Sequence, residues 1–155
     1  GRADELPPDF EVLVFGRGSH DCYATLCMSE PEDDEKLELH LLAEAHAEPR
    51  HDIVEVLTAV AHFHRTGARL GLGHTVNFGR PWLAGSNATH GLISLPYLDG
   101  PKVEWAAGPQ IRCLWLIPIT QAEREFKMLH GLEALEARFE SSQFDYANPR
   151  RRSVV

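Results

Sequence analysis

Residues 111–140 read IRCLWLIPITQAEREFKMLHGLEALEARFE, and this stretch joins two secondary-structure patterns without a loop between them. The large apolar residues of 114–119 predict a buried strand. From Thr120 onward the sequence becomes charged and takes helical spacing. Thr120 and Glu123 form a T-x-x-E capping box, in which each side chain satisfies a backbone N–H of the other residue at a helix start. The sequence therefore predicts a buried strand that runs directly into a capped helix.

The patterns on both sides of this junction predict a small sheet covered by helices. Runs rich in apolar and β-branched residues predict strands at 11–15, 22–28, 37–45, 90–95, 102–105 and 111–117, although 37–45 would also suit a short helix. Helical spacing predicts helices at 52–65 and 121–139, and the glycine-rich segment 71–87 predicts an irregular loop. The expected fold class is α+β, a mixed α/β sandwich with one central mixed sheet of about six strands flanked by helices.

Each predicted helix has an expected buried face and expected ends. In 52–65 the apolar stripe begins at Ile53 and ends at His64, with Asp52 as a cap and Gly67 as the terminator. In 121–139 Gly131 is a position for a split or kink. The residues of this second helix expected to be buried are Phe126, Leu129, Leu132, Leu135 and Phe139.

Length, charge and cysteine content limit the possible functions. A chain of 155 residues fits one domain, here read as a flexible lead-in (1–9), a folded domain (10–148) and a basic C-terminal tail (149–155). The net charge of −8 argues against nucleic acid and favours a basic protein partner, unless it serves only solubility. No apolar run is long enough to span a membrane. Three cysteines without paired spacing predict a reducing cytoplasm.

Histidines offer the main candidate for a catalytic site. His74, His90 and His130, with Glu123 or Glu125, have acceptable ligand types for a metal, although their spacing gives no support for one. A metal-dependent hydrolase is therefore an alternative function. The Gly71-to-His74 loop lacks the lysine of a phosphate loop, and no serine lies in a nucleophile elbow. We expect no enzyme activity and no cofactor.

Aromatic residues near turns are candidates for partner binding. Trp82 and Tyr97 each follow a proline directly, and Trp105 lies three residues before Gly108. Such rings form interface hot spots, or they cover the edge of the core. The acidic segment EPEDDE at 30–35 is either a solvated loop or a binding surface. The residues proposed as partner contacts are Trp82, Tyr97, Trp105, Glu32, Asp33 and Asp34.

Three segments of the chain together carry a resemblance to a known family. They are GLGHT at 71–75, LISLPY at 92–97 and LWLIPIT-x-x-E-x-x-F-K-x-x-H-G-x-x-A-L at 114–135. In these segments the chain resembles bacterial proteins of the suppressor-of-fused (SUFU-like) domain family. The resemblance extends from about Phe10 to the C-terminus, and it is weaker near the start, where relatives have a longer lead helix.

The resemblance implies a fold and a class of function. It implies a mixed sheet flanked by helices. It also implies a cytoplasmic protein-binding module, since the animal relatives hold a transcription factor through an added peptide strand. Bacterial members have been proposed as immunity proteins that neutralise polymorphic toxins, often nucleases. The remaining alternative is a regulatory homodimer, because the sequence leaves the oligomeric state open.

Overall fold

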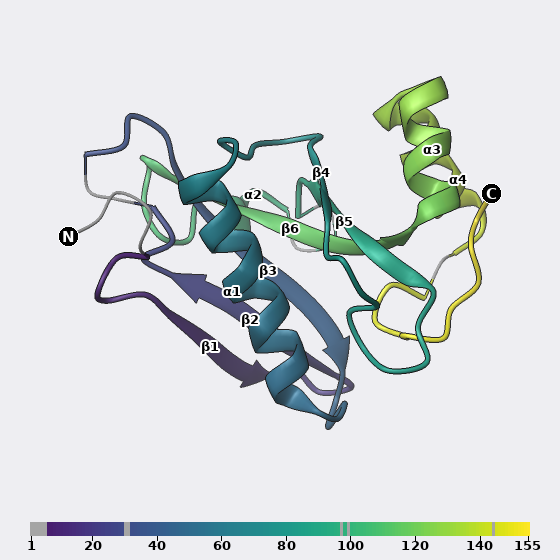
Figure 1. Ribbon diagram of the computed structural model, residues 1–155, viewed down its shortest axis with the longest axis horizontal. Helices are drawn as coiled ribbons and strands as arrows, with labels where there is room; N and C mark the ends of the chain where they lie inside the picture. Colours follow the sequence, from purple (N-terminus) through teal and green to yellow (C-terminus); the bar gives the residue numbers. More distant parts are fainter. Residues whose placement is uncertain (1–5, 30–31, 97, 99, 144) are drawn as a thin grey trace.

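The structure is a computed structural model that describes residues 6–29, 32–96, 98, 100–143 and 145–155. A mixed six-stranded sheet forms its centre, with strand order β1-β2-β3-β6-β5-β4 (Figure 1). All neighbouring strands are antiparallel except β3 and β6, which run parallel. The strands are β1 (Glu11–Gly16), β2 (His20–Leu26), β3 (Lys36–Glu44), β4 (Thr75–Asn77), β5 (Ala88–Ser94) and β6 (Ile111–Thr120).

Helices cover the two faces of this sheet unequally. α1 (Arg50–Thr66) crosses one face and buries Ile53, Leu57 and their neighbours against the larger part of the core (Figure 1). α3 (Gln121–His130) and α4 (Leu132–Ser141) follow β6, and α4 packs Leu135 and Phe139 against the opposite face. The short helix α2 (Pro101–Glu104) precedes β6. The predicted fold class is therefore confirmed.

The junction at Thr120 forms as predicted. β6 is the longest strand, and α3 begins at the next residue. The Thr120 hydroxyl accepts a hydrogen bond from the Glu123 N–H at 3.1 Å, and the Glu123 carboxylate accepts one from the Thr120 N–H at 2.8 Å. The split at Gly131 is also confirmed, because α3 ends and α4 begins on its two sides, with a φ of 91° that favours glycine.

Several local predictions are wrong, each for a physical reason. Residues 102–105 belong to a helical turn rather than a strand, and the sixth strand is β4, inside the predicted loop. β4 has only three residues, which is too short for a visible alternation. α1 begins at Arg50 after Pro49, so Asp52 lies inside its first turn and does not cap it, whereas Gly67 ends it as expected. Leu129 is 80% exposed rather than buried, since the face of α3 that packs inward is the one that carries Glu123.

Two further observations concern the cysteines and the possibility of a membrane span. Cys22, Cys27 and Cys113 are free thiols. Within the described residues, no helix has the length and apolar character needed to cross a membrane.

Candidate functional site

The parallel pair at the centre of the sheet brings two distant loops together. Lys36 at the start of β3 lies beside Ile111 at the start of β6. The segments that lead into two parallel neighbours reach the same end of a sheet. The acidic loop before β3 and the α2–β6 connection therefore meet there, far apart in sequence but adjacent in space (Figure 1).

A shallow hollow of about 570 Å³ lies between these loops. We call it the acidic hollow. Trp105 is on its rim, with 43% of its surface exposed. Its lining comprises Glu32, Asp33, Asp34, Glu35, Lys36, Trp105, Pro109, Gln110 and Arg112. Four of the six residues proposed from the sequence as partner contacts thus share one surface.

Ion pairs hold the walls of the acidic hollow in place. Asp33 accepts hydrogen bonds from Arg65 at 3.0 Å and from Arg69 at 3.1 Å, which ties the loop to α1 and the segment after it. On the opposite wall Arg112 lies 5.9 Å from the centre of the Trp105 ring and 3.5 Å from Glu104. These contacts position the ring and the loop before any partner arrives, which lowers the entropic cost of binding.

The charges on the rim favour a cationic ligand group. Glu32, Asp34 and Glu35 are exposed, and they line the hollow together with the partly exposed Trp105. A lysine or arginine side chain of a ligand can bind both groups, through ion pairs with the carboxylates and a cation–π contact with the ring. The arrangement is therefore suited to the recognition of a cationic side chain.

The other two proposed contacts do not join this surface. Trp82 is only 1% exposed and belongs to the core under α1, so its assignment as a partner contact is wrong. Its backbone N–H donates to the carbonyl of Ala88 at 3.1 Å, which ties this part of the β4–β5 connection to the start of β5. Tyr97 lies outside the described residues.

The three histidines of the alternative metal site do not assemble. The exposed His74 accepts a hydrogen bond from the Gly71 N–H through Nδ1, at 3.0 Å. His90 lies 2.9 Å from the Thr89 hydroxyl, and burial, with the nearby Arg124 charge, lowers its pKa. His130 contacts the Phe126 ring at 4.5 Å. No group of three or more metal-ligating side chains occurs among the residues that the structure describes.

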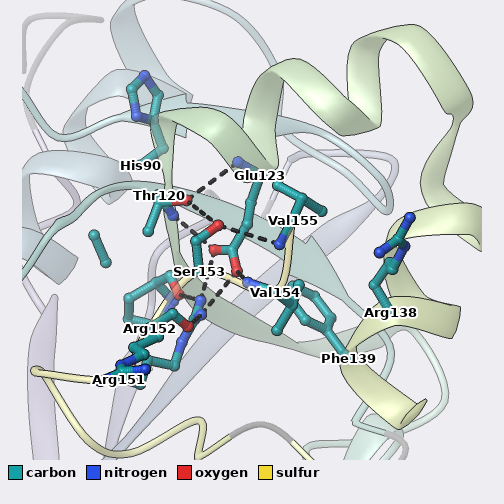
Figure 2. Close-up of polar contacts among 12 residues, drawn as sticks. His90, Thr120, Glu123, Arg138, Phe139, Arg151, Arg152, Ser153, Val154 and Val155 are labelled. Carbon is teal, nitrogen blue, oxygen red and sulfur yellow. Dashed lines mark hydrogen bonds and ion pairs between the residues drawn. The ribbon is translucent and has the colours of Figure 1, made fainter. Parts of the chain in front are cut away.

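The sequence reasoning missed a buried ion pair at the strand-to-helix junction. Arg151 reaches back from the C-terminal segment and donates from two guanidinium nitrogens to the two carboxylate oxygens of Glu123, each at 2.8 Å (Figure 2). It also donates to the Pro118 carbonyl at 2.9 Å, and Val154 N–H donates to Glu123 at 3.0 Å. We call this set the C-terminal clamp. Arg151 is the middle one of three consecutive arginines in the tail, and nothing in the sequence distinguishes it from the other two.

The C-terminal clamp keeps its carboxylate ionised. Burial alone would raise the pKa of Glu123, but hydrogen bonds and charge from Arg151, together with the N–H groups of Thr120 and Val154, hold that pKa below its usual range. A carboxyl whose pKa is lower in the folded state stabilises the fold above the pKa of the unfolded chain.

Acid should therefore weaken the C-terminal clamp. Above about pH 4.5, near the usual carboxyl pKa, the contribution of Glu123 is fully present. It is lost as the pH falls through the lower pKa of the folded state. We expect the stability difference between the wild type and Glu123→Gln to shrink with acidification in this range. Urea unfolding at a series of pH values measures it, and a difference independent of pH would contradict the assignment.

Comparisons with known proteins place this geometry in context. The family model described as suppressor of fused protein (SUFU) matches residues 7–152. A crystal structure from Neisseria gonorrhoeae FA 1090, described as a SUFU homolog, is 32% identical, with a TM-score of 0.85 over 100% of this chain and 83% of that one. No curated protein matches the chain.

More distant solved structures share the fold. The crystal structure of the Sufu–Fu complex is 13% identical with a TM-score of 0.66, over 99% of this chain and 80% of that one. Drosophila Suppressor of Fused is also 13% identical, with a TM-score of 0.65, and this chain covers 42% of its length.

Proposed function

Because this chain belongs to the suppressor of fused family, we propose that it is a non-enzymatic protein-binding module, acting as an immunity protein that neutralises a basic, nuclease-like toxin domain. The observation that carries the proposal is the acidic hollow, where Trp105 lies among Glu32, Asp33 and Asp34. The Sufu of the Sufu–Fu complex is a distant relative with the same fold that is bound to another protein.

Electrostatics supports a basic partner. A nuclease domain presents lysine and arginine side chains to the phosphate backbone of its substrate. This chain carries a net charge of −8, and its exposed carboxylates at the hollow would face such a surface. Complementary fields accelerate association and orient the partners, and the Trp105 ring on the rim supplies a hot spot. The free thiols fit the reducing cytoplasm in which a nuclease would meet its inhibitor.

The test is protection and binding against toxin domains encoded beside this gene. The chain is co-expressed with each toxin domain, and binding of the purified proteins is measured by calorimetry. We expect protection and a complex with at least one basic domain. Glu32→Lys/Asp34→Lys and Trp105→Ala should each weaken binding about tenfold or more, because they reverse the rim charge or remove the ring.

A matched control separates the site from net charge. Glu125→Lys/Glu140→Lys makes the same charge change as the double variant of the hollow, at exposed positions on α3 and α4 away from the hollow, and should leave the affinity within about threefold of the wild type. Equal losses in the control and in the hollow variants would show that the hollow is not the contact surface. A chain that neither binds nor protects against any neighbouring toxin would contradict the immunity role itself.

A further inference from the structure

The two edges of the sheet differ in how much they offer to a partner. β4 closes one edge with three residues. β1 closes the other with six residues, EVLVFG, which contain no lysine or proline. Natural edge strands are commonly protected by such residues, since an open edge pairs with further strands. β1 is the longer and less protected edge (Figure 1).

The side chains next to this edge are also apolar and exposed. Pairing with β2 places Leu13 opposite Ala24 and Phe15 opposite Cys22, on the face away from α1. Leu13 is 42% exposed, Phe15 48% and Leu26 39%. On that face α4 and the C-terminal segment pack over β5 and β6, and these three side chains lie beyond the part that they cover.

The hydrogen bonding of β1 determines which backbone groups the edge presents. Arg17 N–H donates to the His20 carbonyl at 2.7 Å, so Arg17 directs its backbone groups toward β2. Successive residues of an antiparallel strand direct these groups to alternate sides. Leu13 and Phe15 therefore also direct theirs toward β2, whereas Val12, Val14 and Gly16 present N–H and C=O groups at the free edge.

We propose that β1 is a self-association surface, on which the β1 of a second copy pairs antiparallel about a two-fold axis at Val14. In this register Val14 pairs with its own copy, and Val12 pairs with Gly16 through the outward backbone groups. The same register places Leu13 beside Phe15 of the second copy. A two-fold interface requires such self-complementarity, and here the backbone and the apolar side chains both provide it.

Charge complementarity favours a second copy of the chain as the partner of β1, and it favours the register centred on Val14. Glu11 and Arg17 are exposed and lie three positions before and after Val14. The antiparallel pair therefore places Glu11 opposite Arg17 of the second copy, once at each end. Opposite charges on facing strands stabilise the pair, and like charges destabilise it. The surface is separate from the acidic hollow, so the self-association does not depend on the proposed partner.

Sedimentation equilibrium of the 155-residue chain, over a wide range of concentration, tests the proposal. We expect a reversible species of twice the 17.4 kDa monomer mass. Val14→Pro should abolish it, because it removes the N–H at the two-fold axis, and that N–H makes no hydrogen bond within the monomer sheet. Circular dichroism checks that this variant folds.

Charge reversal tests the register without altering the edge backbone. Glu11→Lys and Arg17→Glu should each raise the dimer dissociation constant about tenfold, because each creates two like-charge pairs. The double variant Glu11→Lys/Arg17→Glu should restore the wild-type constant. A chain that stays monomeric at every concentration, or a dimer that is unaffected by both Val14→Pro and the charge reversals, would overturn the proposal.

Discussion

Replacing Arg151 with alanine is expected to lower the free energy of unfolding by about 3–5 kcal/mol, a large share of the stability of a domain of this size. The Arg151 side chain is 6% exposed and that of Glu123 is 0% exposed. Removing the guanidinium leaves a buried carboxylate with only its two backbone donors. It also leaves the Pro118 carbonyl without the arginine hydrogen bond, so the Val154 and Ser153 hydrogen bonds must hold the C-terminal segment at the junction without the ion pair.

The neighbouring Arg152 provides the matched control. It is exposed, and Arg152→Ala should change the free energy of unfolding by no more than about 0.5 kcal/mol. Arg151→Lys keeps the charge but loses the two-pronged geometry, so we expect an intermediate loss. Urea denaturation followed by circular dichroism measures all three variants. An Arg151→Ala loss equal to that of Arg152→Ala would show that the C-terminal clamp does not stabilise the fold.

Trp82→Ala is expected to cost about 3–5 kcal/mol of stability, because it removes a large buried side chain and leaves a cavity. Trp82 packs in the core cluster under α1, next to Leu83 and near Ala88. We expect incomplete folding or a strongly reduced unfolding midpoint in urea. Any loss of partner binding by this variant should follow from unfolding rather than from a missing contact.

Trp105→Ala also replaces a tryptophan with alanine, but we expect it to leave the stability nearly unchanged. With 43% of its surface exposed, Trp105 contributes little to the core, and its removal should change stability by no more than about 0.5 kcal/mol. Circular dichroism is the suitable probe, since fluorescence changes with the number of tryptophans. A stable, fully folded Trp82→Ala that had lost only partner binding would contradict the placement of this ring in the core.

Local patterns predicted the elements whose signals lie within a few residues. The capping box at Thr120 and Glu123 needs only a three-residue spacing, and the end of α1 at Gly67 needs only one glycine. Short elements gave weaker signals. Residues 102–105 alternate like a strand, yet they form a helical turn that follows Gly100. β4 is a strand only because β5 provides its hydrogen-bond partners.

Whether each tryptophan ring is exposed or buried was also determined by the tertiary structure and not by the local sequence. Trp82 and Trp105 both lie within three residues of a glycine, and local composition does not show which of the two rings is buried. The path of the chain turns one ring into the core and leaves the other on the rim of the acidic hollow. Burial depends on which elements pack over a residue, and that is settled by contacts distant in sequence.

The sequence by itself determined the strand-to-helix junction, the α+β class and the pattern that identifies the family. Only the tertiary structure decided the acidic hollow and the C-terminal clamp. The hollow requires the parallel pairing of β3 with β6, and the clamp requires Arg151 to return to Glu123. Capping and periodicity arise from neighbours along the chain, whereas these two sites join segments that meet only when the whole sheet has formed.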